Sequence, residues 1–320
     1  MSSSLSAQRV LVTGGTGFLG RAVQAALRRR GVTDVTAPSS SEVDLLDRAR
    51  ADALVADTAP DLIIHLAARV GGIGANMERP ADLYLENLLL GTNVIEAART
   101  AGTAKIVVVG TICSYPKHTP VPFRESDLWK GYPEETNAPY GIAKLAQLVH
   151  LQANRAQHGQ HGIYLMPTNL YGPGDKFHPS VSHVIPALIR KCVVAGERGV
   201  GHVEVWGTGS ASREFLYVDD AAEGIVLAAE RYDAPEPVNL GADRELPIKE
   251  LAEIIAELSG FDGELRWDHT RPDGQPRRSV DAGRARELFG FEATTDFREG
   301  LRATIDWYLA NREQAEARRS

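Results

Sequence analysis

The feature that most constrains this chain is a glycine-rich turn close to its N-terminus. Arg9–Val12 is expected to form a strand, and Thr-Gly-Gly-Thr-Gly-Phe-Leu-Gly follows at positions 13–20. A strand that enters Gly-x-x-Gly-x-x-Gly and then a helix is typical of a dinucleotide-binding βαβ unit. Gly14 would permit the tight turn, Gly17 would let the backbone approach a pyrophosphate, and Gly20 would let the helix pack closely on the sheet. The N–H groups of that helix would face the phosphates, and a glycine-rich turn without a ligand is the alternative.

Strand-like and helix-like runs alternate through the first half of the chain. The expected strands are Arg9–Val12, Val35–Thr36, Leu62–His65 and Ile106–Val109, and the expected helices are Ala22–Arg30, Ala81–Arg99 and Tyr140–Ala156. Such alternation predicts βαβ units and a parallel sheet. In the second half, Val184–Val194 and Leu246–Leu258 are expected to be helices, and the polar, basic stretch Asp268–Ser279 is expected to be a loop.

The length of 320 residues suggests about two domains. We therefore predict an α/β protein in which a Rossmann-type doubly wound parallel sheet is followed by a smaller C-terminal substrate-binding α/β domain. The first domain would span residues 1–173 with a returning segment at about 212–242, and the second would span mainly residues 174–320.

Composition excludes several classes of protein. With 35 basic and 42 acidic residues the net charge is −7, which argues against a nucleic-acid partner or an anionic membrane surface. No apolar run reaches the roughly 18 residues of a membrane span, and the first residues lack the pattern of a signal peptide. The two cysteines, Cys113 and Cys192, are too few for a disulfide scaffold or a cysteine-based zinc site. We expect a cytoplasmic protein without a bound metal.

A tyrosine and a lysine stand four residues apart in Tyr140-Gly-Ile-Ala-Lys144. On a helix the two side chains share one face, and a nearby Lys⁺ should lower the pKa of a tyrosine. Such a pair can pass a proton to or from a substrate oxygen while hydride moves to or from a nicotinamide. Tyr-x-x-x-Lys alone usually marks a surface helix, but its position after a dinucleotide loop favours catalysis.

Two further polar groups follow the strand Ile106–Val109. Thr111 would place a hydroxyl near Tyr140, because open α/β sheets bind ligands at the carboxyl ends of their strands. Cys113 would point to the same side if the strand persists. The alternative for Cys113 is a small buried apolar residue, and that is the interpretation for Cys192.

Together these residues resemble the extended short-chain dehydrogenase/reductase family. Within it, the resemblance is greatest to the 3,5-epimerase/4-reductases of GDP-4-keto-6-deoxy-mannose. It covers nearly the whole chain and is densest in His65–Asn76, Tyr115–Lys117, Asn137–Lys144, Pro167–Pro173, Phe177–Ser180, Ser182–Ala187, Val205–Gly207, Arg213–Leu216 and Pro272–Gly274.

The resemblance implies roles for individual residues. Tyr140 would donate a proton at the 4-keto group, with Lys144 supporting it and Thr111 bonding the same oxygen. Cys113 and His183 would be the base and acid that invert C3 and C5, although His183 has a structural helix role as its alternative. The implied nucleotide-sugar contacts are Asn169, His183, Lys191, Trp206 and Arg213. The implied cofactor contacts are Gly14, Thr16, Gly17, Phe18, Leu19, Gly20, Asp44, Leu45, Leu66, Ala67, Ala68, Tyr140, Lys144, Pro167, Asn169 and Leu170.

The cofactor is NAD or NADP. Members of the family carry basic residues for the NADP 2′-phosphate where this chain has Thr16 and the run Ser39–Ser41, so NAD is favoured. The acidic segment Glu42–Asp47 follows and either faces the adenine or caps a helix. An NAD-recycling 4-epimerase of a nucleotide-linked hexose or heptose is therefore the second candidate function. A non-catalytic dinucleotide sensor is the third.

A homodimer is also expected. Related enzymes pair the two helices predicted here at 81–99 and 140–156 into a four-helix bundle across a two-fold axis. Apolar residues available for that contact are Leu85, Leu88, Leu89, Leu148 and Leu151. Packing inside one subunit is the competing explanation for them.

Overall fold

A six-stranded parallel sheet forms the first half of the molecule. The computed structural model describes residues 4–71, 73–271 and 273–318, so Gly72 and Pro272 of the resemblance motifs lie outside the described residues. The sheet comprises β2 (Val35–Thr36), β1 (Val10–Thr13), β3 (Leu62–His65), β4 (Lys105–Val109), β5 (Gly162–Pro167) and β9 (Val238–Leu240), in that order. Every neighbouring pair is parallel. The predicted doubly wound α/β fold is confirmed.

Helices cover both faces of this sheet. One face packs against α1 (Phe18–Arg29), α7 (Val218–Arg231) and α9 (Gly283–Phe289), and the other against α2 (Arg48–Thr58), α4 (Pro80–Ala101) and α5 (Ala138–His158). Alternate strand residues serve the two cores: Val10 and Val12 join the first, and Leu11 joins the second. Because both faces are buried, β1 and β3 are continuous runs of buried residues.

The carboxyl ends of β1 and β3 form the switch point of the sheet. From β1 the chain runs to β2 on one side and then crosses back to β3 on the other side of β1. Such a reversal of strand order opens a crevice for ligands. The loops after the two strands touch: the Leu66 amide donates to the Thr13 carbonyl at 3.0 Å. A Cβ atom at Gly14 would lie 2.8 Å from the Ala67 amide nitrogen, and Gly14 has a φ of +72°. Only glycine fits this turn without strain.

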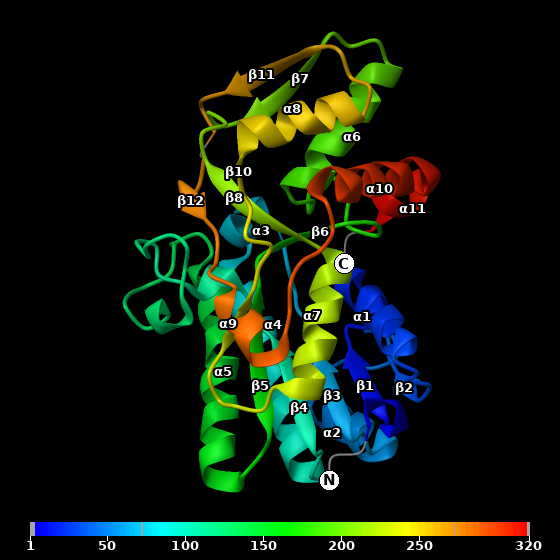
Figure 1. The fold of residues 1–320 in the computed structure, drawn as a ribbon, viewed down its shortest axis with the longest axis vertical. Helices are drawn as coiled ribbons and strands as arrows, with labels where there is room; N and C mark the ends of the chain where they lie inside the picture. Colours follow the sequence, from blue (N-terminus) through cyan, green and yellow to red (C-terminus); the bar gives the residue numbers. More distant parts are fainter. Residues whose placement is uncertain (1–3, 72, 272, 319–320) are drawn as a thin grey trace.

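A second hydrophobic core lies beyond the carboxyl ends of the sheet, in the upper half of Figure 1. Its strands are β6 (Asn169–Tyr171), β7 (His202–Trp206), β8 (Ser212–Tyr217), β10 (Glu245–Pro247), β11 (Glu264–Asp268) and β12 (Arg277–Arg278). Its helices are α6 (Val184–Glu197), α8 (Ile248–Leu258), α10 (Phe297–Ala310) and α11 (Arg312–Ala317), while α3 (Ile73–Glu78) lies beside α4. The chain returns to the large sheet through α7 and β9.

Several predicted element bounds change in the structure. Strands β2 and β3 have the predicted limits, and α5 begins two residues before Tyr140. Leu246 belongs to β10, because the helix begins only after Pro247, at Ile248. The stretch 268–279 is not a loop throughout: Arg277 and Arg278 form β12, which pairs with β8. Two arginines lack the β-branched or aromatic side chains that mark a strand such as β2, so the pairing with β8 specifies β12.

Two of the leucines considered for a dimer contact have another role. Leu148 and Leu151 are 1% and 3% exposed and belong to the core between α5 and the sheet. For these two, packing inside the subunit is the correct explanation. Leu85 and Leu89, by contrast, are 53% and 37% exposed on α4.

Candidate active site

The glycine loop forms a rigid turn at the start of α1. Gly17 is the N-cap of α1, so the first amides of the helix lack helical partners and face the switch point. A Cβ atom at Gly20 would lie 2.2 Å from the Gly14 carbonyl oxygen, which agrees with the close packing expected there. Arg21 fastens the loop, donating to the carbonyls of Thr16 at 2.9 Å and Gly174 at 3.1 Å. This cradle fits a dinucleotide diphosphate.

The corner after β2 carries a carboxylate. Glu42 accepts hydrogen bonds from the Ser39 hydroxyl at 2.6 Å and the Ser39 amide at 2.7 Å, and these bonds lower the pKa of Glu42. Asp47 has the helix-capping role, accepting from the Ala49 amide at 2.8 Å and the Arg50 amide at 3.3 Å. Leu45 has its side chain in the core, which leaves only its backbone for a cofactor.

Tyr140 and Lys144 lie in the first turns of α5, and burial dominates the electrostatics of both. Burial and the electrostatic interaction with Cys113 raise the pKa of Tyr140, while a hydrogen bond with the Thr111 side chain acts in the opposite direction. The expectation that Lys144 lowers the pKa of Tyr140 is wrong here. Burial lowers the pKa of Lys144 itself to about 7, so the ammonium is only partly populated near neutral pH.

Cys113 reaches Tyr140 through a turn and not through a strand. Strand β4 ends at Val109, and Cys113 lies in the short 3-10 helix η2 (Ile112–Ser114), so the strand does not persist as far as the prediction required. Thr111 caps η2, its hydroxyl accepting from the Cys113 amide at 3.2 Å. A Cβ atom at Gly141 would lie 2.4 Å from the Cys113 carbonyl oxygen, so glycine lets η2 approach α5.

Two arginines lie beside the thiol of Cys113. Arg278 Nη1 is 3.6 Å from Cys113 Sγ. Arg213 donates to the carbonyls of Ser212 at 2.7 Å and Asp273 at 3.2 Å, and burial together with Arg278 lowers its pKa to about 10. Sequence reasoning missed Arg278. The basic character of 268–279 was the available signal, but nothing in it distinguished Arg278 from its neighbours.

The remaining predicted contacts lie on the second core. His183 is the N-cap of α6, and its side chain is exposed. Asn169 donates to the Glu214 carbonyl at 2.8 Å.

Trp206 is 56% exposed and lies between two cations. The Lys191 ammonium lies 5.9 Å and the Arg271 guanidinium 4.8 Å from its ring. An aromatic face flanked by cations can take both the base and the phosphates of a nucleotide.

Cys192 is buried in α6, where burial raises its thiol pKa to about 11, as expected of an apolar core residue. Among the residues that the structure describes, no group of three His, Cys, Asp or Glu side chains is arranged to hold a metal. Within the same described ranges, no helix combines the length and apolar character needed to cross a bilayer.

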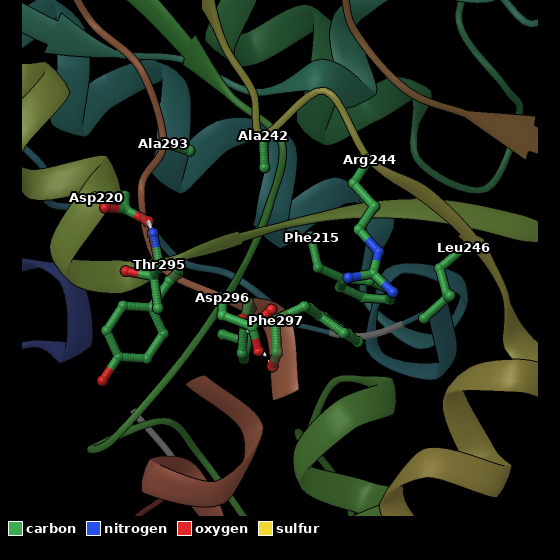
Figure 2. A pocket seen from close by; sticks show the side chains of 11 residues that line it. Phe215, Asp220, Ala242, Arg244, Leu246, Ala293, Thr295, Asp296 and Phe297 are labelled. Carbon is green, nitrogen blue, oxygen red and sulfur yellow. Dashed lines mark hydrogen bonds between the residues drawn. The ribbon is translucent and has the colours of Figure 1, made fainter. Parts of the chain in front are cut away.

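A cavity of about 130 Å³ lies apart from these residues (Figure 2). Aromatic side chains of β6, β8 and α10 line it, and the Arg244 guanidinium lies 5.2 Å from the Phe297 ring. None of the predicted catalytic or binding residues contributes to its lining.

Comparison with known proteins agrees with this geometry. Residues 10–241 match the NAD dependent epimerase/dehydratase family. GDP-L-fucose synthase 1 of Arabidopsis thaliana is 44% identical over 97% of this chain and 96% of its own length. GDP-L-fucose synthase of Escherichia coli K12 is 38% identical over 97% and 99%. The crystal structure of a GDP-L-fucose synthetase from Naegleria fowleri bound to NADP superimposes with a TM-score of 0.88 at 28% identity, covering 96% of this chain and 95% of that one.

Proposed function

Because the chain belongs to the NAD dependent epimerase/dehydratase family, we propose that it is a GDP-L-fucose synthase-like enzyme, a 3,5-epimerase and 4-reductase of a GDP-4-keto-6-deoxy-hexose. It is an NAD(P)-dependent enzyme of the extended short-chain dehydrogenase/reductase type. The observation that carries the proposal is the meeting of Thr111, Cys113 and Tyr140 where η2 packs on α5. Cys113, as the base that removes a proton from carbon, and Tyr140, as the proton donor, can then act on the same sugar ring.

The two half-reactions depend on the same ketone. A 4-keto group acidifies the hydrogens at C3 and C5, because the carbanion formed on deprotonation is stabilised as an enolate. The Cys113 thiolate is suited to remove such a proton and protonated His183 to return one on the opposite face. Tyr140 then donates its phenolic proton to O4 during reduction, and Thr111 holds the same oxygen. The nicotinamide supplies the hydride when bound.

The nucleotide end of the substrate meets cations and an aromatic ring. Trp206 offers an exposed face to the base, with Lys191 beside it. Arg213 is held by two backbone carbonyls near the Cys113 thiol, and its charge suits the diphosphate. Asn169 and His183 complete the proposed sugar contacts.

We further propose that NAD(H) serves at least as well as NADP(H). Thr16 and Ser40 are uncharged, so neither offers a cation to a 2′-phosphate. This removes two charge-assisted contacts worth roughly 1.5–3 kcal/mol each. The Glu42 carboxylate beside Ser39 adds repulsion at the same corner. The remaining predicted cofactor contacts come from the loops after β1, β3 and β5.

A homodimer and a cytoplasmic location complete the proposal. Leu85 and Leu89 are exposed on α4, and Pro80, Tyr84, Tyr132 and Ile142 line a groove where α4 and α5 begin. A second copy would bury this apolar face. Both cysteines are free thiols, which suits a reducing compartment.

Deuterium exchange on the 4-keto substrate in D₂O tests the function. Mass spectrometry should detect exchange at C3 and C5 with the wild type. Cys113→Ser should nearly abolish it, because a hydroxyl is far less acidic than a thiol. Tyr140→Phe should retain exchange and lose reduction. An NAD-recycling 4-epimerase would show no wild-type exchange despite substrate binding, and that result would refute the assignment.

A further inference from the structure

Arg278 is fixed against the Cys113 thiol by a chain of hydrogen bonds. Its Nη1 lies 3.6 Å from Cys113 Sγ, while its Nε and Nη2 both donate to Gln275 Oε1 at 3.2 Å. Gln275 Nε2 in turn donates to the Lys117 carbonyl at 3.0 Å. The guanidinium is thus tied to the segment that follows Cys113 in the chain.

The backbone around Arg278 is equally restrained. Strand β12 aligns Arg278 with Arg213 of β8. Two residues later the Val280 amide donates to the buried Glu214 carboxylate at 2.7 Å. The neighbouring Arg277 turns away and pairs with the Glu245 side chain. Only one of the two adjacent arginines therefore contacts the thiol.

Charged and titratable groups reach Cys113 from three elements. Arg278 comes from β12, Arg213 from β8 and Tyr140 from α5. Arg213 is engaged with backbone carbonyls, and Tyr140 is a neutral phenol below its raised pKa. The Arg278 cation is the one in contact with sulfur.

We propose that Arg278 is a positioning residue that holds Cys113 as a thiolate ready to act as a base. A cation beside a thiol favours the ionised form. The thiolate then takes the proton from C3 or C5, the C–H electron pair moves into the enolate, and Cys113 leaves the step as a neutral thiol. The substrate in this step rests on the proposed function, whereas the ionisation of Cys113 does not.

Alkylation by iodoacetamide tests the inference without substrate. Cys113 is partly exposed, whereas Cys192 is only 1% exposed. Peptide mass spectrometry can therefore follow the alkylation of Cys113 alone. In Arg278→Gln the pH midpoint of the alkylation rate should rise by about one unit, which makes alkylation roughly tenfold slower below both midpoints. Arg278→Lys should restore most of this shift. Arg277→Gln, the matched control, should behave as the wild type.

Equal pH midpoints of alkylation for wild type and Arg278→Gln would overturn the inference. So would an Arg278→Lys variant whose alkylation midpoint equals that of Arg278→Gln. Weaker GDP binding with equal midpoints would assign Arg278 to the diphosphate instead. If Arg278→Gln does not fold, the wild type decides, because a midpoint at or above the ordinary thiol value of about 8.5 contradicts a stabilised thiolate. A shifted midpoint without deuterium exchange in the wild type would refute the proposed function and leave this inference intact.

Discussion

At the scale of single residues, burial controls the groups that the chemistry uses. Lys144 and Tyr140 were expected to interact as a charge pair, yet desolvation is the largest influence on both. A lysine that ionises near neutral pH can exchange protons with its surroundings more readily than an ordinary one. The tyrosine stays a phenol over the physiological range, which is the form needed to donate a proton to O4.

The pKa of Lys144 predicts how stability depends on pH. In the folded protein its pKa is about 7, against 10.5 for an exposed lysine, so between these values the unfolded state binds more protons. The unfolding free energy of the apoenzyme should therefore rise with pH across this window relative to Lys144→Met. Thermal unfolding of both proteins at several pH values measures the difference. A constant difference would contradict the low pKa.

The proposed cofactor preference is also a residue-scale matter. Ser40→Arg restores a cation where a 2′-phosphate would lie and should tighten NADPH binding about tenfold or more. Affinity for NADH serves as the internal control and should change little. Dissociation constants from fluorescence titration measure both. A wild type that prefers NADPH tenfold over NADH would contradict the proposal.

At the scale of elements, the approach of η2 to α5 brings the two chemistries together. The Ser114 hydroxyl donates to the Gly141 carbonyl at 2.9 Å, and the Tyr164 hydroxyl donates to the Lys144 carbonyl at 2.8 Å. The first bond fixes the helix that carries Tyr140 against the turn that carries Cys113, and the second fixes the same helix to β5. A shift of one element would separate the base from the proton donor.

Gly141→Ala should disrupt this approach. The added Cβ would lie 2.4 Å from the Cys113 carbonyl oxygen. Its nearest neighbours are all backbone atoms, so no flexible side chain can move aside to relieve the clash. We expect a loss of about 1–3 kcal/mol in the free energy of unfolding and a large fall in kcat. Gly196→Ala is the matched control, because a Cβ there meets nothing within 4 Å, and it should be neutral or slightly stabilising. Unchanged kcat in Gly141→Ala would contradict this account.

At the scale of the whole molecule, the exposed face of α4 suggests assembly. Light scattering at micromolar concentration should give a dimer mass, and Leu85→Glu with Leu89→Glu should shift it towards the monomer by placing charge in an apolar contact. Leu288→Glu is the control, since Leu288 is 42% exposed on α9, away from α4. A monomeric wild type would exclude the dimer.

The sequence alone determined the parallel sheet, the glycine loop and the candidate pair Tyr140 and Lys144. These features are local, since alternating strand and helix patterns, glycines at fixed offsets and an i,i+4 spacing all lie within short windows. Strand β3 illustrates this, because Leu62, Ile63 and Ile64 form an apolar run directly after Asp61, and all four residues of the strand are buried.

Tertiary structure decided the rest. Arg278 meets Cys113 across 165 residues of chain, and its two-residue strand exists only because β8 pairs with it. Leu148 and Leu85 look alike in sequence, yet one is buried and the other exposed. The sign of the pKa shift of Tyr140 likewise follows from how deeply packing encloses it. Contacts, burial and desolvation depend on which distant segments pack together, and no local pattern contains that information.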